Sequence, residues 1–388
     1  MTEIYFDNSA TTRVSPEALA AYVEASENEW GNPSSRHSRG QEAEKLIAGA
    51  RACLCDALGS GGEVVFTAGG TEANNLAIRG RLTAKPRFFR GGKILTTAGE
   101  HSSVTRPLEA LAREGLRVVE IPTRGGVLDL DALRREATPD TCLVTMMLVN
   151  NESGARYFLE EAARITRAAC PDAVFHIDAT QAFLKFPWSV KQMGADLVTV
   201  SSHKIRGPKG VGALWMSPAV VKNRGIAPLT LGGGQEGGYR SGTENVPGIA
   251  AFAAAVRQGM KDLPETTARL TSLRETLIRG VSETPALREV RCQLPPVAAP
   301  HIVSLTLPRI KSETMLHYLS SEGIYVSSGS ACSSHDTHLS HAMLAFGLSE
   351  KEADCTIRVS FGVQNTEAEI ARFLEVLSAG VGSLIRIR

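Results

Sequence analysis

The chain has 388 residues, of which 43% are hydrophobic and 21% charged, a composition typical of a globular protein with one large or two smaller domains. The 42 basic and 41 acidic residues give a net charge of +1, which does not indicate a protein that binds nucleic acid or an anionic membrane through its overall charge. No apolar run reaches the ~20 residues of a membrane-spanning helix, and the first residues lack a secretory signal pattern. We therefore expect a cytoplasmic protein without membrane or direct nucleic-acid contacts.

Apolar, β-branched runs alternate with amphipathic helical patterns over the first part of the chain. The predicted strands are Glu63–Thr67, Lys93–Thr97, Arg117–Ile121, Cys142–Asn150, Val174–Asp178, Leu197–Ser201 and Gly212–Trp215. The predicted helices are Gln41–Leu58, Thr71–Arg81, Ser103–Glu114, Leu130–Arg135 and Glu160–Ala169. This alternation predicts an α/β fold with a mostly parallel sheet and helices on both faces.

The pattern changes after about residue 245. Two long helices are expected at Val246–Lys261 and Pro264–Gly280, followed by strands at His301–Leu307, Ile324–Ser327 and Thr356–Ser360, a helix at Ser312–Ser321 and a last helix from Thr366. These elements predict a smaller α+β domain. We place the large domain at residues 14–255 and the small domain, with Cys332 and Arg358, at residues 1–13 and 256–388.

Polar clusters follow five of the predicted strands. They are FTAGGTEANN, TTAGEHSSV, LVNNESG, HIDATQA and VSSHK. Ligands of parallel α/β sheets bind beyond the carboxyl ends of the strands, so the five clusters are expected to line one crevice.

Four of these polar residues suit a pyridoxal-type cofactor. Partial burial of Lys204 at a strand end favours the neutral amine that forms imines, and the Asp178 carboxylate would keep a pyridine nitrogen protonated. Thr71 follows a Gly-Gly turn that opens a helix, which suits a phosphate, and His101 would stack on a flat ring. Each residue alone also has an ordinary explanation, such as a surface lysine or a helix N-cap.

Ten motifs carry a resemblance that covers nearly the whole chain, from residue 5 to residue 362. In chain order they are YFDNSATT, GNPSSRH, FTAGGTEANN, EHSSV, VNNESG, HIDATQA, SSHKIRGPKGVGALW, GGGQEGGYRSGTENV, SSGSACSS and IRVSFG. The set resembles the cysteine desulfurases, a pyridoxal-phosphate family of the aminotransferase class V type. The resemblance implies a fold-type I enzyme of this cofactor class.

The resemblance also assigns the cofactor residues. Lys204 would hold pyridoxal 5′-phosphate covalently and move protons, Asp178 would pair with the pyridine nitrogen, and His101 would stack on the ring and carry protons. The remaining cofactor contacts implied are Gln181 and Asn151 near the phenolate oxygen, Gly70, Thr71, Ser201 and His203 at the phosphate, and Thr243 at the phosphate of the other subunit. The last contact implies a homodimer.

The substrate residues follow in the same way. Arg358 would bind the carboxylate of L-cysteine, with help from Asn32 and Asn151. Cys332 would take the sulfur as a persulfide and leave L-alanine. The sulfur would then pass from a mobile loop to an acceptor protein, for iron–sulfur cluster assembly or for thiolation of nucleic acids.

Seven cysteines are scattered along the chain, at positions 53, 55, 142, 170, 292, 332 and 355. Their odd number and wide spacing argue against a disulfide framework and for a reducing compartment. Most are interpreted as small buried side chains. Cys332 differs, because small polar residues surround it and predict an exposed loop where a thiol can ionise.

Two features fall outside the resemblance. Residues 155–158 read Ala-Arg-Tyr-Phe, where many family members have a short apolar-Gln-Pro run. We expect this difference to change only local contacts or a surface that binds a partner. His335, His338 and His341 follow Cys332 at intervals of three. We expect a polar loop there rather than a dedicated metal site, while transient iron–sulfur ligation by Cys332 stays open.

Alternative functions also remain at the level of sequence. A selenocysteine lyase, a transaminase or an epimerase would use the same scaffold, and the last two would not need Cys332. A protein that binds the cofactor mainly to organise a sulfur-transfer assembly is a further alternative. The sequence identifies neither the sulfur acceptor nor the preference between sulfur and selenium.

Overall fold

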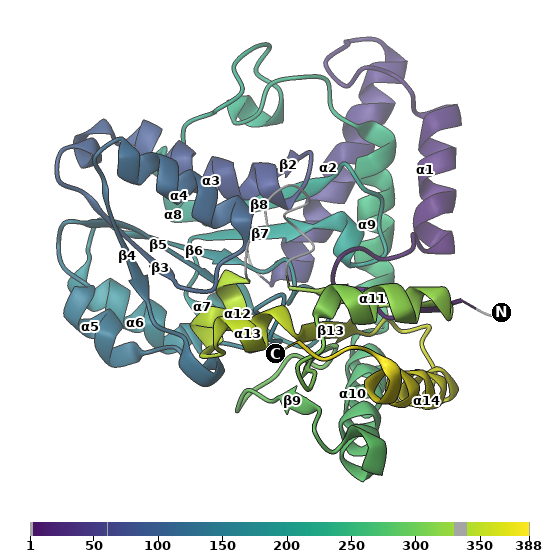
Figure 1. Cartoon of the computed structure of the whole chain (residues 1–388). Coiled ribbons are helices and arrows are strands. Elements are labelled where there is room, and N and C mark those ends of the chain that lie inside the picture. Colours follow the sequence, from purple (N-terminus) through teal and green to yellow (C-terminus); the bar gives the residue numbers. More distant parts are fainter. Residues whose placement is uncertain (1–2, 60, 330–339, 388) are drawn as a thin grey trace.

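The computed structural model describes residues 3–59, 61–329 and 340–387 (Figure 1). Two sheets with separate apolar clusters organise this part of the chain. The larger sheet is built from residues 63–216, and the smaller one from residues 291–360.

The larger sheet has seven strands in the order β2-β8-β7-β6-β5-β3-β4. They are β2 (Glu63–Thr67), β3 (Lys93–Thr97), β4 (Arg117–Ile121), β5 (Thr141–Met147), β6 (Val174–Asp178), β7 (Leu197–Ser201) and β8 (Gly212–Met216). The neighbours from β7 to β4 pair in parallel, and β8 runs antiparallel to both β7 and β2. This confirms the predicted α/β class with a mostly parallel sheet.

Helices cover both faces of this sheet (Figure 1). One apolar cluster contains residues of α3 (Gly70–Ala84), α4 (Ser102–Arg113) and α8 (Pro218–Lys222). The other contains residues of α2 (Ser38–Leu58), α5 (Leu130–Glu136), α6 (Leu159–Ala169), α7 (Val190–Met193) and α9 (Val246–Lys261), and α1 (Pro16–Asn28) packs on α9. Every residue of the central strands β5, β6 and β7 is buried, as expected of a sheet covered on both faces.

The smaller sheet has the order β12-β13-β10-β9. Its strands are β9 (Arg291–Gln293), β10 (Ile302–Thr306), β12 (Ser327–Ser328) and β13 (Thr356–Ser360), and its helices are α10 (Leu263–Glu283), α11 (Ser312–Ser321), α12 (His341–Phe346), α13 (Glu350–Asp354) and α14 (Glu367–Ser383). Ile4 and Phe6 join the apolar cluster of this unit, which otherwise comes from residues 270–381. The division at residues 13/14 and 255/256 stays a prediction.

The structure corrects two predicted strands and shows a helix, α1, that was not predicted. The strand expected at Cys142–Asn150 ends at Met147, because the Asn150 side chain then accepts the N–H groups of Glu152 and Ser153 and closes a turn. The strand expected at Ile324–Ser327 is two short strands, since β11 (Ile324–Tyr325) pairs with β1 (Ile4–Tyr5) and β12 pairs with β13. Helix α1 was not predicted, although Ser15 and Pro16 give it an N-cap and a proline at the first turn.

Among the described residues, no helix is both long and apolar enough to cross a membrane.

Candidate active site

A cavity of about 290 Å³ lies at the carboxyl ends of the parallel strands. Ten of the predicted site residues line it together: Gly70, Thr71, His101, Asn151, Asp178, Gln181, Ser201, His203, Lys204 and Arg358. Nine of them come from the large unit, and Arg358 comes from β13 of the smaller sheet. The residues are far apart in sequence, and the strand ends bring them together as expected for this fold class.

Three predicted residues are not part of this cavity. Asn32 is exposed and its side chain accepts the N–H of Ser34 at 2.9 Å. Thr243 is exposed on the segment between α8 and α9. Cys332 lies outside the described residues, as do His335 and His338. Their predicted roles stay predictions.

Lys204 lies in a short 3₁₀ turn directly after β7. Its side chain points toward the first residues of the chain, where Nζ donates to the carbonyl oxygens of Ser9 and, at 2.8 Å, Ala10. These contacts place the amine in the same cavity as Asp178 and His101. The buried strand LVTVS therefore positions a lysine amine at the floor of a polar crevice, as the imine chemistry requires.

Asp178 is the last residue of β6, and two donors hold its carboxylate. Thr180 N–H donates to Oδ1 at 2.9 Å, and Asn74 Nδ2 donates to Oδ2 at 2.8 Å. Asn74 Nδ2 also donates to Ser103 Oγ at 2.8 Å, which in turn lies 2.8 Å from His101 Nδ1. A continuous chain of hydrogen bonds thus connects Asp178 with His101.

Sequence reasoning missed Asn74 and Ser103, which are both buried. Asn74 belongs to α3 and Ser103 to α4, and neither pattern differs from that of a helix face that packs on a sheet. Only the packing of the two helices on one face of the sheet places these side chains between His101 and Asp178.

His101 caps the N-terminus of α4, where its Nδ1 accepts the N–H of Ser103. Burial lowers the pKa of His101, Asp178 opposes this effect, and the charges of Lys204 and Arg358 add to it. A neutral imidazole with Nδ1 engaged leaves Nε2 for contact with a ring or a proton.

The first turn of α3 forms an anion cradle at one end of the cavity. Gly70 lies so close to its neighbours that a Cβ would stand 3.3 Å from Thr180 Oγ1 and 3.4 Å from Ser201 Cβ. Ser201 Oγ is buried and has no hydrogen-bond partner in the described part of the chain. An unpartnered hydroxyl beside a helix N-terminus fits a phosphate group.

His203 and Lys209 line the outer side of this cradle. Burial and the charges of Lys204 and Lys209 lower the pKa of His203 to about 4, and its Nδ1 lies 3.2 Å from Thr11 Oγ1. His203 is therefore neutral at pH 7 and can donate to a phosphate oxygen without carrying charge.

Arg358 faces the cavity from the other side. Its Nη1 donates to the Asn151 carbonyl oxygen at 2.9 Å, and its Nη2 forms an ion pair with Asp7 Oδ1 at 2.8 Å. Its Nε is buried without a partner among the described residues. A largely buried guanidinium with a donor to spare suits a substrate carboxylate.

Gly329 and Ser340, the residues on either side of positions 330–339, both lie against Glu152. Ser340 Oγ donates to Glu152 Oε2, and a Cβ on Gly329 would overlap the same oxygen. Burial raises the pKa of Glu152 to about 7. Since Glu152 adjoins Asn151, the segment with Cys332 begins and ends beside the cavity.

The departure at residues 155–158 forms part of the boundary between the two sheets. Arg156 stacks on Phe186 with 4.3 Å between the guanidinium carbon and the ring centroid, and Ala155 pairs with Ala298. Tyr157 is buried, whereas the Phe158 side chain is 61% exposed. These residues thus make local contacts, and the aromatic ring of Phe158 stays on the surface.

Comparisons with known proteins show the family of the chain. The family described as Aminotransferase class-V matches residues 4–373. The chain belongs to the class-V aminotransferase family. It is 37% identical to "Cysteine desulfurase IscS 1" of Archaeoglobus fulgidus, over 96% of this chain and 95% of the relative. Among solved structures, it is similar to a "NIFS-LIKE PROTEIN" with a TM-score of 0.91 and 33% identity, over 99% and 100% of the two chains.

A third relative was solved with an amino acid. "SspA in complex with cysteine" matches 94% of this chain and 100% of its own with a TM-score of 0.79 and 31% identity. The cofactor of the class-V family is pyridoxal 5′-phosphate. The site fits this group, because the amine of Lys204, the Asp178 carboxylate and the unpartnered Ser201 hydroxyl lie in one cavity.

Proposed function

We propose that the protein is a cysteine desulfurase, which converts L-cysteine to L-alanine and retains the sulfur as a persulfide on Cys332. The observation that carries this proposal is the single cavity shared by Lys204, Asp178, His101 and Arg358. The names of the relatives and the cysteine bound by one of them support the same substrate.

The cofactor residues act as a set. Lys204 would hold pyridoxal phosphate through its amine, Asp178 would hold the pyridine nitrogen, and Gly70, Ser201 and His203 would hold the phosphate. When bound, the cofactor supplies an electron sink for the bond electrons released at the substrate Cα. Lys204 Nζ would take the proton from Cα, and His101 Nε2 would carry a proton at the other face.

Arg358 orients the amino acid by its carboxylate. The guanidinium is fixed by Asp7 and the Asn151 carbonyl, so it loses little freedom when the substrate arrives. The buried Nε, which has no partner among the described residues, and a neighbouring N–H would donate to the substrate carboxylate as a pair.

The described cysteines argue for Cys332 as the sulfur acceptor. Burial raises the pKa of all six of them: Cys53, Cys55, Cys142, Cys170, Cys292 and Cys355, with values of about 12 for Cys142 and about 11 for Cys292. A thiol with a raised pKa forms little thiolate at pH 7 and is a poor nucleophile. Cys332 is the remaining cysteine of the chain.

The sulfur step balances without a further reagent. The Cys332 thiolate would attack Sγ of the substrate, and an S–S bond would form as the Cβ–Sγ bond breaks, which leaves the bond electrons on Cβ. Cβ would take up a proton and Lys204 would return the proton to Cα, which yields L-alanine and a Cys332 persulfide. The sulfur-acceptor protein, in iron–sulfur assembly or thiolation, remains part of this proposal.

A homodimer is proposed on independent grounds. The outer face of α1 exposes Leu19, Tyr22 and Val23, and Trp30 is 65% exposed next to it. Thr243 is also exposed and contributes nothing to the cavity of its own chain. A second copy that covers the apolar face would bring its Thr243 to the cofactor phosphate.

We also propose a cytoplasmic location, in line with the unpaired cysteines among the described residues.

The decisive experiment is incubation of the holoenzyme with ³⁵S-labelled L-cysteine. We expect one labelled sulfur per chain, mapped to Cys332 by mass spectrometry under non-reducing conditions, together with L-alanine release. Cys332→Ser should keep the cofactor absorbance and lose both products, whereas Cys292→Ser should behave as the wild type. A transaminase or an epimerase would be unaffected by Cys332→Ser, and a cofactor-binding assembly factor would show no turnover alone.

A further inference from the structure

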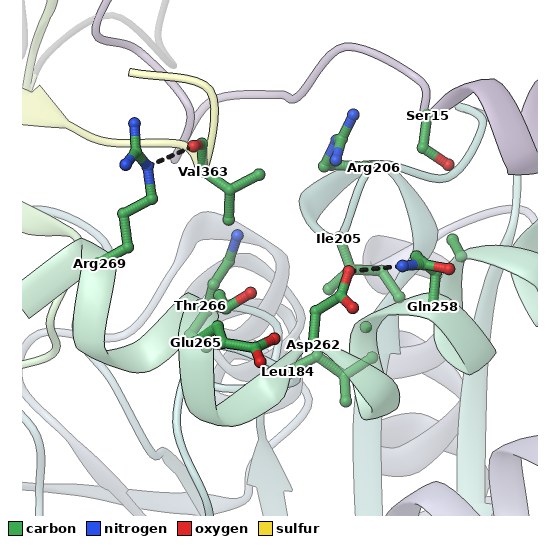
Figure 2. A pocket seen from close by; sticks show the side chains of 13 residues that line it. Ser15, Leu184, Ile205, Arg206, Gln258, Asp262, Glu265, Thr266, Arg269 and Val363 are labelled. Carbon is green, nitrogen blue, oxygen red and sulfur yellow. Dashed lines mark hydrogen bonds between the residues drawn. The ribbon is translucent and has the colours of Figure 1, made fainter. Parts of the chain in front are cut away.

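A second cavity, of about 280 Å³, lies beside the proposed active site (Figure 2). Its walls are the ends of α9 and α10 and the two segments that follow β6 and β7. The same two segments supply Gln181 and Lys204 to the cofactor cavity. They supply Lys185 and Arg206 to this one, so the two cavities share walls.

Lys185 is a buried lysine without a counter-ion. Its side chain is 7% exposed, and its ammonium has no hydrogen bond or ion pair within the described residues. Lys93, which is 1% exposed, donates to Thr138 and has the carboxylates of Glu136 and Asp140 at 4.0 and 3.8 Å. A buried charge without a partner is unfavourable. Lys93 has carboxylates that offset its charge, whereas Lys185 has no such ion pair within the described residues.

Arg206 adds a second unpaired cation. It is half-buried, and its guanidinium has no hydrogen bond or ion pair in the described part of the chain. Its φ of 68° is left-handed, which is uncommon for arginine, and the backbone is held there by Thr12 Oγ1 and the Ser15 N–H, both at 2.8 Å. Leu184, another lining residue, also has a left-handed φ, of 56°.

The neighbouring charges do not neutralise these two cations. Burial, Lys204 and Arg206 together lower the pKa of Lys185 to about 8. Asp262 accepts the amide of Gln258 at 2.6 Å, and Glu265 is exposed on α10. Figure 2 shows both carboxylates on the side of the cavity formed by the helices, and neither forms an ion pair with Lys185 or Arg206.

The third cation of the cavity is already engaged. Arg269 donates from Nε to the Val363 carbonyl oxygen at 2.6 Å, as Figure 2 shows, and from Nη2 to the Asn365 carbonyl oxygen. It forms part of the cavity wall, and Lys185 and Arg206 are the two lining cations without such a partner among the described residues.

We propose that this second cavity binds a small oxyanion, a carboxylate or a phosphate, between the Lys185 ammonium and the Arg206 guanidinium. The volume lies just below the range of about 300–1,000 Å³ of drug-sized ligand sites, so a ligand of a few heavy atoms fits. Gln258 and Thr266 line the cavity as additional polar groups. This site does not depend on the proposed desulfurase activity.

The site also has a consequence for the catalytic lysine. Arg206 is two residues from Lys204, and the charges of Lys185 and Lys204 act on each other. An anion between Lys185 and Arg206 would offset part of the positive charge behind the cofactor cavity. The bound anion and the cofactor cavity are therefore linked through these two segments.

The first test is calorimetric titration of the holoenzyme with inorganic phosphate and, separately, with acetate, at constant ionic strength set by chloride. The bound cofactor fills the phosphate cradle and leaves the second cavity as the site under test. We expect one site per chain for at least one of the two anions. Lys185→Met and Arg206→Gln should each weaken binding about tenfold or more, since each removes a charged donor.

A matched control and a wild-type measurement complete the test. Lys222→Met replaces an exposed lysine of α8 and should leave the affinity unchanged. In the wild type, acylation by an N-hydroxysuccinimide ester followed by mass spectrometry should label Lys185, and the anion should slow this labelling but not that of Lys222. Equal labelling of Lys185 with and without either anion would overturn the proposal. A dimer structure in which a carboxylate of the second copy contacts Lys185 would do the same.

Discussion

Glu100 offers a prediction that depends only on the fold around His101. Its side chain is buried, and Oε1 accepts from Thr97 Oγ1 at 2.6 Å and from the Met147 N–H at 2.8 Å. Oε2 is buried without a partner in the described residues. Burial raises the pKa of Glu100 to about 8, the two hydrogen bonds oppose this, and the Asp178 charge adds to it.

The raised pKa makes the stability of the protein depend on pH. The folded protein holds the Glu100 proton more tightly than the unfolded chain, where the ordinary pKa is 4.5. The stabilisation is fully present below pH 4.5 and is lost as the pH rises through about 8. At 1.36 kcal/mol per pH unit, this interval corresponds to a loss on the order of 5 kcal/mol.

Glu100→Gln keeps the accepting oxygen and cannot ionise, so the variant should lack this loss. The measurement is the free energy of unfolding of the holoenzyme in urea across that pH interval. We expect the wild type to lose several kcal/mol more than Glu100→Gln toward high pH. Glu44→Gln, at an exposed position of α2, should follow the wild type. Parallel curves for the wild type and Glu100→Gln would refute the assignment of a protonated carboxyl.

Three further predictions concern the proposed active site. Lys204→Ala should remove the covalent cofactor absorbance after gel filtration and abolish L-alanine release, and a retained covalent adduct would contradict the role of Lys204. Arg358→Lys keeps the charge but loses the bidentate contact, so KM for L-cysteine should rise roughly ten- to hundredfold in steady-state kinetics, with a smaller change in kcat. Asn74→Leu removes the two 2.8 Å hydrogen bonds that Asn74 donates, one to Asp178 and one to Ser103. A hydrogen bond to a charged group contributes about 1.5–3 kcal/mol, so the Kd of the cofactor should rise by about tenfold or more in an absorbance titration. An unchanged Kd would show that Thr180 suffices to hold Asp178.

The sequence was most informative where strand ends carry function. Five strands of the larger sheet were predicted with the bounds that they have, because each is a short apolar run with a polar residue at its end, as in LVTVS before Ser202 and VFHI before Asp178. The ten residues in the cofactor cavity followed from those strand ends and from the family motifs.

The sequence was least informative where long-range packing decides. Nothing in the apolar pattern indicated that Ile4–Tyr5 would pair with Ile324–Tyr325, since a two-residue strand has no periodicity. The contact of Asp7 with Arg358 links positions 351 residues apart, and it exists because Asp7, two residues after β1, forms a β-bridge with Ser360 at the end of β13. The Lys185–Arg206 cavity was missed for the same reason, because each residue alone resembles a surface cation.

The meeting of Gly329 and Ser340 at Glu152 bears on how such an enzyme can diversify. Since the residues on either side of positions 330–339 already meet, the number of residues between them is nearly free to vary, because doubling that number adds only about 0.6 kcal/mol of closure entropy. Insertions or deletions between Gly329 and Ser340 would then change the length of the segment that carries Cys332 and leave the residues of the cofactor cavity in place. The same fold would then supply sulfur to acceptor proteins whose acceptor sites lie at different depths, through a change in the length of this one segment.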